Sequence, residues 1–174
     1  MTDLKNIIRN VPDFPKKGIG FKDITTLLKD GAAFKQAVDE MAAPFKNKNI
    51  EVIVGIESRG FIFGSVIAYN WGISMVPARK PGKLPAETVK EEYELEYGTD
   101  AIEIHKDAIK PGQNVLIIDD LLATGGTMAA TAKLVEKLGG HVVGISFLVE
   151  LDFLKGRDKL DKYRVHSLVH YDSE

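Results

Sequence analysis

The sequence predicts an α/β fold in which helices flank a central, mostly parallel sheet. Short apolar runs rich in β-branched residues recur along the chain, as in buried strands, and stretches with apolar residues at helical spacing lie between them. Strands that alternate with helices form right-handed units whose strands run parallel in one sheet. The chain has 174 residues and no linker-like or low-complexity segment, so we expect one domain spanning residues 1–174.

Local patterns predict the elements of the first half. Residues 3–10 have the pattern of a short amphipathic helix, whereas the prolines and glycines of residues 11–24 indicate an irregular segment. Residues 31–46 have apolar residues at helical spacing, and Pro44 is expected to end or kink this helix. A buried strand and an apolar helix complete this half, at residues 51–56 and 60–71.

The second half contains a predicted hairpin. Residues 91–98 and 100–105 alternate polar and apolar side chains, as two paired strands do, and a basic, proline-rich segment at 79–85 precedes them. The sheet is completed by four strands and one further helix. The strands are expected at 73–78, 114–119, 141–151 and 163–171, and the helix at 127–138.

The composition excludes several function classes. A net charge of −2 provides no global field for nucleic acid, and no apolar run approaches the ~20 residues needed to span a bilayer. The chain has no cysteine, and its first residues are polar. We therefore expect a cytoplasmic protein that binds neither nucleic acid nor membrane. Its histidines show no metal-ligand spacing and are expected on the surface or in packing: His105, His141, His166 and His170.

The stretch "VLIIDDLLATGGT", residues 115–127, predicts a phosphate site at the start of a helix. Such a helix start presents unpaired N–H groups and the positive end of the helix dipole. Gly125 and Gly126 allow the backbone to approach an anion closely, and Thr124 and Thr127 offer hydroxyl donors. A phosphate monoester fits this loop.

Two acids directly precede the loop and need a different partner. Ionised Asp119 and Asp120 can only accept hydrogen bonds, and a vicinal diol offers two O–H donors. A ribose 5-phosphate carries both features, the diol at one end and the phosphate at the other. An ordinary strand-to-helix turn with an Asp cap is the competing interpretation. A Walker B element is not favoured, because the chain contains no GxxxxGK[ST] loop.

This stretch also resembles the phosphoribosyl diphosphate (PRPP) signature of the type I phosphoribosyltransferases. The resemblance implies that the acids hold the ribose hydroxyls and the loop holds the 5-phosphate. It further implies the type I fold, with a flexible hairpin lid at about residues 80–99 and a small hood formed by the N- and C-terminal segments. The implied ribose-5-phosphate-binding residues are Asp119, Asp120, Ala123, Thr124, Gly125, Gly126 and Thr127.

Two further segments could hold an anion. On pattern alone, residues 57–60 are as well explained by an ordinary Gly-rich turn, and residues 79–83 by a solvated basic loop. The first segment is similar to the pyrophosphate loop of the same family, which implies a cis peptide bond between Glu57 and Ser58. The basic loop, which also carries Lys80, would clamp the same anion. The implied pyrophosphate-binding residues are Glu57, Ser58, Arg59, Gly60, Arg79 and Lys83.

Flanking motifs resemble the adenine-specific members of the family: "GIGFKDI", "LEYG" and "LVELDFLKGR". The resemblance implies that Phe21 and Leu151 hold the two faces of adenine, and that the backbone near Gly20 and Lys22 hydrogen-bonds its edge. The family usually has arginine at position 22 and often a bulkier residue at position 20. On pattern alone, Phe21 is also compatible with core packing.

The resemblance implies transfer of the 5-phosphoribosyl group from PRPP to adenine, which gives AMP and pyrophosphate. Glu96, Tyr97 and Arg59 would be catalytic, with Glu96 exchanging a proton with the base. Mg²⁺ would be held mainly by PRPP and water, without dedicated protein ligands, and the protein would be a homodimer. Two alternatives remain open: an enzyme for another purine such as xanthine, and a non-catalytic nucleotide-binding regulator on the same fold.

Overall fold

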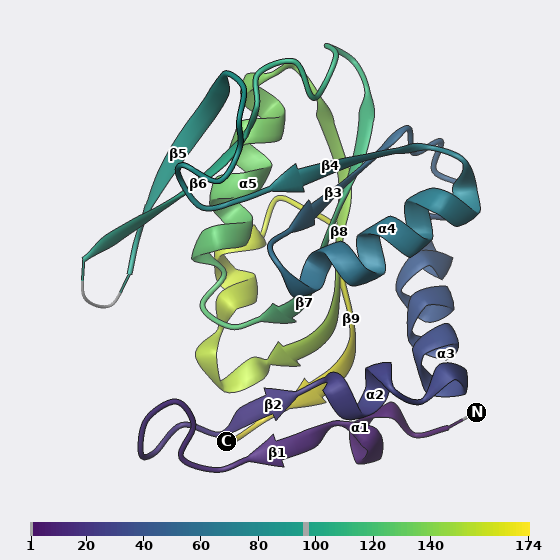
Figure 1. Cartoon of the computed structure of the whole chain (residues 1–174), viewed down its shortest axis with the longest axis vertical. Helices are drawn as coiled ribbons and strands as arrows, with labels where there is room; N and C mark the ends of the chain where they lie inside the picture. Colours follow the sequence, from purple (N-terminus) through teal and green to yellow (C-terminus); the bar gives the residue numbers. More distant parts are fainter. Residues whose placement is uncertain (1, 96–97) are drawn as a thin grey trace.

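The central sheet is parallel, as the alternation of strands and helices predicts (Figure 1). The computed structural model describes residues 2–95 and 98–174. Within this part of the chain the sheet has five strands, in the order β4-β3-β7-β8-β9. The strands are β3 (Val52–Ile56), β4 (Ser74–Ala78), β7 (Asn114–Leu122), β8 (His141–Leu151) and β9 (Val165–Tyr171).

Helices cover both faces of this sheet. The helices α3 (Gly31–Ala42) and α4 (Arg59–Trp71) lie on one face, and α5 (Gly126–Lys137) lies on the other (Figure 1). Successive side chains of a strand point to opposite faces, so β7 contributes to two hydrophobic cores. Leu116 and Ile118 pack with α3 and α4, whereas the intervening Ile117 packs with α5.

Local chemistry sets the ends of the helices. The Asp30 carboxylate accepts hydrogen bonds from the backbone N–H groups of Ala32 and Ala33, each at 3.1 Å, and so caps the start of α3. At its other end α3 stops at Ala42, and a 3₁₀ turn, η1 (Ala43–Phe45), contains Pro44. The predicted effect of this proline is confirmed.

The N-terminal segment is more regular than its sequence indicates. It contains α1 (Leu4–Ile7), β1 (Arg9–Val11), β2 (Phe21–Asp23) and α2 (Thr25–Leu28). The expected helix 3–10 is therefore shorter, and the expected irregular segment 11–24 includes a strand. The two strands pair antiparallel over only three positions, too few to produce a visible alternation in the sequence.

The small sheet β1-β2 and the C-terminal strand together form the hood that the family resemblance implies. Lys5 Nζ donates a hydrogen bond to the His170 carbonyl oxygen at 2.6 Å, and the Lys22 ammonium lies 4.3 Å from the centre of the Tyr171 ring. Figure 1 shows β1 and β2 beside the end of β9 and the C-terminus.

The predicted hairpin is confirmed and begins earlier than expected. Its strands β5 (Thr88–Glu94) and β6 (Thr99–His105) pair antiparallel and project from the sheet beside α5 (Figure 1). Ile102 and Ile104 of β6 are buried in the core on the α5 side. The base of the hairpin is therefore part of the folded body of the molecule.

The strand expected at 114–119 extends further than its apolar pattern indicates. The strand β7 continues through both acids to Leu122, because the long β8 still offers it partners: Leu121 pairs with Val149, and Leu122 with Glu150. Asp119 and Asp120 therefore belong to a paired strand, which holds their backbone firmly. Over residues 2–95 and 98–174, none of the helices has the length and apolar composition needed to cross a membrane.

We predict that Gly144→Ala destabilises the protein by about 1–3 kcal/mol, because overpacking of a filled core is destabilising. An added Cβ at Gly144 would overlap with the ring of Phe45, which is fully buried. Gly31→Ala is the matched control, since the space around Gly31 is open at the start of α3. Denaturant unfolding measures both variants, and equal stabilities would contradict the packing argument.

Candidate active site

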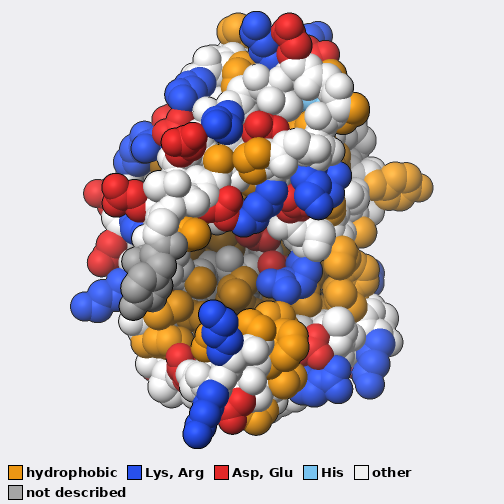
Figure 2. All heavy atoms as spheres, turned by 60° about the vertical axis from the view of Figure 1, so that its left-hand side comes forward, with side chains coloured by type: hydrophobic (Ala, Val, Ile, Leu, Met, Phe, Trp, Pro, Cys, Tyr) orange, Lys and Arg blue, Asp and Glu red, His pale blue; other side chains and the backbone are white. Residues whose placement is uncertain are grey.

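A cavity of about 330 Å³ lies where strands β3 and β7 reach their carboxyl ends. Ligands of open α/β sheets bind at such an edge. On the face shown in Figure 2, basic and acidic side chains surround a central hollow. Both segments that the sequence singles out contribute to the cavity, together with the hairpin and the basic loop. The lining residues are Ile56, Glu57, Ser58, Arg59, Lys80, Ile102, Asp119, Asp120, Leu121 and Thr127.

The first turn of α4 rests directly on β7 because residue 60 is glycine. A Cβ atom at Gly60 would lie 2.7 Å from the Ile118 carbonyl oxygen and 3.0 Å from Asp119 Oδ1. A side chain at this position would therefore push α4 away from the strand. Gly60 was expected to bind pyrophosphate. In the structure it has a packing role, because it sets the distance between the turn that begins α4 and the end of β7.

Arg59 connects the acid pair to the hood. Its Nε donates to Asp120 Oδ2 at 2.5 Å, and Asp120 is only 4% exposed. The Arg59 guanidinium also lies 5.4 Å from the centre of the Phe21 ring. Arg59 was expected to contact pyrophosphate, whereas this structure places it between an acid and an aromatic ring.

The carboxyl group of Asp119 has a shifted pKa. Burial and the negative charge of Asp120 raise its pKa well above the usual range, and these effects outweigh the hydrogen bond that Asp119 Oδ1 accepts from the Asp120 N–H at 2.8 Å. The positive charge of Arg59 opposes the shift but lies nearer to Asp120. The acid pair therefore has a deficit of positive charge or of hydrogen-bond donors, which a diol or a cation at this edge would supply.

Glu57 organises the basic loop. The peptide bond between Glu57 and Ser58 is cis, as the resemblance implies. Glu57 Oε2 accepts from Arg79 Nε at 3.1 Å and from Arg79 Nη2 at 3.0 Å, and Glu57 Oε1 accepts from the Lys80 backbone N–H at 2.5 Å. Lys83 is exposed, and its carbonyl oxygen accepts a 3.4 Å hydrogen bond from Arg79. The Glu57 carboxylate therefore fixes the loop beside the cavity.

The predicted phosphate loop packs backbone against backbone on Gly156, a residue to which the sequence assigned no role. Gly125 has φ +77°, and a Cβ atom there would overlap with the Gly156 carbonyl oxygen. A Cβ atom at Gly156 would in turn overlap with the Ala123 carbonyl oxygen. Thr124 at the tip of the loop is exposed. Gly156 therefore supports the loop through direct backbone packing.

An ion pair between the exposed Arg157 and the buried Glu150 holds the Gly156 segment in place. Gly156 begins the 3₁₀ segment η3 (Gly156–Leu160), and its neighbour Arg157 donates to both carboxylate oxygens of Glu150, at 2.9 and 2.5 Å. Burial disfavours the charge of Glu150, but the hydrogen bonds from Arg157 and Ser167 outweigh it and lower the pKa of Glu150. The only sequence signal for this support is the "KGR" of residues 155–157, which carries no chemistry of its own.

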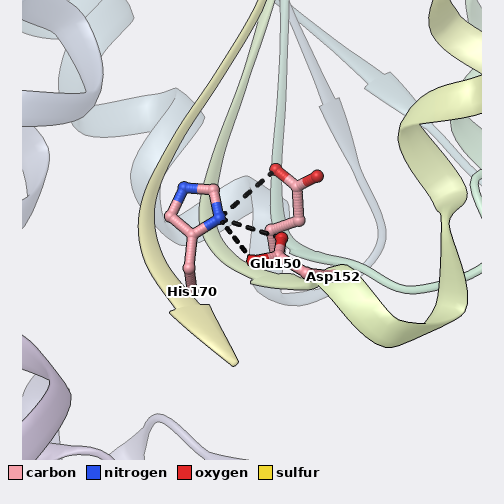
Figure 3. Close-up of side chains that lie close together, drawn as sticks. All are labelled: Glu150, Asp152 and His170. Atoms are coloured by element: carbon pink, nitrogen blue, oxygen red, sulfur yellow. Dashed lines mark hydrogen bonds and ion pairs between the residues drawn. The ribbon is translucent and has the colours of Figure 1, made fainter. Parts of the chain in front are cut away.

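Glu150 also belongs to a group with metal-like spacing, shown in Figure 3. His170 Nδ1 lies 2.9 Å from Asp152 Oδ1 and 4.0 Å from Glu150 Oε2. The three side chains come from β8, β9 and the 3₁₀ segment η2 (Asp152–Leu154). Because Glu150 already accepts from Arg157 and Ser167, we interpret the group as a hydrogen-bond network that connects the C-terminal strand to the segment supporting the proposed phosphate loop.

The residues expected to bind adenine are only partly brought together. Phe21 is half-buried at the start of β2 and contacts Phe14 edge to face, with ring centres 5.2 Å apart, so it is not a core residue. The Lys22 side chain turns into the hood, where its Nζ donates to Asn10 Oδ1 at 3.0 Å. Leu151 packs in the core on the α3 and α4 side. Glu96 and Tyr97 lie outside the described residues.

Comparison with known proteins identifies relatives over nearly the whole chain. The family model for the phosphoribosyl transferase domain matches residues 25–172. An adenine phosphoribosyltransferase of Clostridium perfringens is 64% identical over 169 residues, which cover 97% of this chain and 98% of the relative.

Solved structures agree with this relationship. The adenine phosphoribosyltransferase of Thermoanaerobacter pseudethanolicus is 58% identical, with a TM-score of 0.93 over 97% of this chain and 98% of its own. The enzyme of Saccharomyces cerevisiae, crystallised with an imino-altritol bisphosphate and adenine, is 44% identical. Its TM-score is 0.88 over 94% of this chain and 95% of its own.

We predict that Gly156→Ala weakens binding of ribose 5-phosphate by about tenfold or more, because small displacements of a binding loop have large effects. The added Cβ would displace the loop through Ala123. Gly140→Ala is the matched control. An added Cβ there would also be too close to its neighbours, 2.9 Å from side-chain atoms of Ile109 and Val135, in the turn before β8 at the opposite edge of the sheet. Calorimetric titration below the unfolding temperature measures both, and equal affinities would contradict the supporting role of Gly156.

Proposed function

The chain belongs to the phosphoribosyl transferase family, and we propose that it transfers the 5-phosphoribosyl group from PRPP to adenine, releasing pyrophosphate and forming AMP. One observation carries this proposal. A glycine-rich loop at the start of α5 follows an acid pair on β7, and the acid pair and Thr127 of this loop line a single cavity with the Glu57–Arg59 turn. The arrangement offers separate sites for a phosphate, a diol and a second anion.

The donor binds along this edge. The loop at residues 123–127 takes the 5-phosphate through its backbone N–H groups and hydroxyls. Asp119 and Asp120 accept hydrogen bonds from the ribose hydroxyls, which offset the burial and the charge repulsion that raise the pKa of Asp119. The Glu57–Gly60 turn, with Arg79 and Lys83, takes the pyrophosphate.

The acceptor base lies under the hood. Phe21 offers a half-buried ring, and the Arg59 guanidinium lies 5.4 Å from its centre, which supports a position for a flat group beside that ring. Backbone groups near Gly20 and Lys22 match the amino donor and ring-nitrogen acceptor of adenine. A 6-oxopurine would leave buried polar groups unpaired, at about 1–3 kcal/mol each. Leu151 would limit the base on its other side.

The site is compatible with Mg²⁺ bound together with PRPP. The acid pair provides an oxygen-rich edge with a deficit of positive charge, as the raised pKa of Asp119 indicates. We propose no dedicated protein ligand, because Mg²⁺ keeps waters and readily takes oxygens from phosphates. When bound, the ion neutralises charge on the pyrophosphate leaving group.

In the reaction, the bond between C1 of the ribose and the pyrophosphate oxygen breaks and a bond to N9 of adenine forms. The sugar acquires oxocarbenium character, so the acid pair stabilises it through the ribose hydroxyls. Glu96 exchanges the proton of the base, Tyr97 orders the leaving group, and Arg59 remains beside both substrates. Residues 80–99 act as a lid that excludes water as a competing nucleophile.

We further propose a homodimer. The outer face of α4 carries the most exposed large apolar side chain of the described residues, Tyr69 at 86%, with Ile62 two turns earlier at 37%. An apolar stripe of this kind on a helix is typical of a surface that a partner covers. The cytoplasmic location remains a prediction from composition.

Release of pyrophosphate with adenine, hypoxanthine, guanine and xanthine in parallel tests the proposed function. We expect PRPP- and Mg²⁺-dependent release with adenine, at least about tenfold faster than with any 6-oxopurine, because each mismatched polar group is costly. Preference for xanthine would identify an enzyme for another purine. PRPP or nucleotide binding without release would identify a non-catalytic regulator.

We predict that Glu96→Gln lowers turnover by about 10²-fold or more, because general acid–base groups contribute rate factors of this size. PRPP binding should change little, since the amide keeps the size of the side chain. Steady-state kinetics with a parallel binding titration separate the two effects. Unchanged turnover with weakened PRPP binding would assign Glu96 to binding and contradict its acid–base role.

A further inference from the structure

The lid hairpin is attached to the body of the protein at its base. Arg79 at the end of β4 and Glu103 of β6 exchange two backbone hydrogen bonds, from Arg79 N to Glu103 O at 2.9 Å and from Glu103 N to Arg79 O at 2.7 Å. This bridge fixes one side of the hairpin to the basic loop. Further along the hairpin, Tyr93 of β5 pairs with Asp100 of β6.

Tyr93 attaches the hairpin to the phosphate loop. The Thr127 hydroxyl, in the first turn of α5, donates a hydrogen bond to the Tyr93 phenol oxygen at 3.0 Å. The Tyr93 ring lies against Gly126, where a Cβ atom would be 3.1 Å from Tyr93 Cδ2. Burial raises the pKa of Tyr93, so its phenol keeps its proton at neutral pH, and this single proton can be directed at Asp100 or at Thr127.

On its other side, Tyr93 interacts with groups that belong to the pyrophosphate end of the site. The Asp100 carboxylate pairs with Lys80 Nζ, and this hydrogen bond and, to a smaller extent, the nearby Tyr93 hydroxyl lower the pKa of Asp100. Lys80 lines the cavity, and its backbone N–H donates to Glu57. A continuous chain of polar contacts therefore runs from Thr127 through the hairpin to Glu57.

The small number of hydroxyl protons in this series of polar contacts makes the contacts sensitive to a bound phosphate. Threonine has one hydroxyl proton, and in this structure Thr127 directs it at Tyr93. A phosphate dianion only accepts hydrogen bonds. To donate to phosphate, Thr127 must turn its proton away from Tyr93, and its oxygen then becomes an acceptor for the Tyr93 proton. The hydrogen bond between hairpin and loop is therefore kept, with the Tyr93 hydroxyl as the donor and the Thr127 oxygen as the acceptor.

We propose that Tyr93 is a positioning residue that orients the Thr127 hydroxyl toward the 5-phosphate and thereby holds the lid hairpin on the loop when the donor is bound. This inference rests on the proposed function, because it requires that the loop binds the ribose phosphate. Hydrogen bonds in such a chain polarise one another, so the Tyr93 contact strengthens the bond from Thr127 to phosphate. The ring of Tyr93 alone, which packs on Gly126, cannot do this.

Four proteins test the proposal by calorimetric titration with PRPP and with ribose 5-phosphate: wild type, Tyr93→Phe, Thr127→Val and the double variant. Tyr93→Phe removes one hydroxyl and keeps the ring, so we expect binding of both ligands to weaken about three- to tenfold, as for one hydrogen bond. In the Thr127→Val background the same change should have no further effect, because Tyr93 acts through Thr127.

The matched control is Tyr163→Phe. The Tyr163 hydroxyl donates to Glu136 at 2.9 Å near the C-terminal end of the same helix, so its loss removes a comparable hydrogen bond far from the loop. We expect wild-type affinity for this variant. Steady-state kinetics should show a raised KM for PRPP in Tyr93→Phe with an unchanged KM for adenine.

Unchanged ligand affinity in Tyr93→Phe would overturn the inference, and so would an equal loss in the Thr127→Val background. A wild-type protein that binds neither PRPP nor ribose 5-phosphate would overturn the proposed function, and this inference with it. The two failures are therefore distinguishable from the wild-type titration alone.

Discussion

The ion pair between Arg59 and Asp120 is the contact on which the rest of the site depends. It joins the start of α4 to the end of β7, and it forms only because Gly60 lets the helix rest on the strand. Asp120 is buried, so removal of Arg59 would leave a carboxylate without compensation inside the protein, which is strongly unfavourable. The same guanidinium lies over Phe21, so one side chain connects the regions that are proposed to bind the sugar, the pyrophosphate and the base.

The distribution of charge around the cavity follows from this contact. Three acids around the cavity form ion pairs: Glu57 with Arg79, Asp120 with Arg59, and Asp100 with Lys80. Among the described residues, Asp119 is the cavity acid without a cation within ion-pair distance, and burial beside Asp120 raises its pKa. The protein thus pairs most of the acids around the cavity with a cation. Asp119, where the sugar hydroxyls are proposed to bind, is left without one in the part of the chain that the structure describes. A site prepared in this way needs little rearrangement when its ligand arrives.

The sequence alone predicted the parallel sheet, the hairpin and most helices, because these elements are long enough to show a period. It missed β1, β2 and α2, which are too short, and it ended β7 at Asp119, where the apolar run stops although pairing with β8 continues. The acid pair and the proposed phosphate loop could be singled out from the sequence because their chemistry is local. The support of that loop by Gly156 was not, since the contact joins backbones far apart in the chain and involves no functional group.

The C-terminal segment therefore has a larger part in the site than its sequence indicates. Within a few residues it carries Leu151, expected at the base, Glu150, which pairs with Arg157, and Gly156, which supports the phosphate loop. The His170–Asp152 pair ties this segment to the last strand, which in turn holds the hood through Lys5. Because these contacts are continuous, the base region and the phosphate loop share one support. A displacement of the hood would therefore reach the donor site through packed backbone and ion pairs, without any change in the acids or the loop themselves.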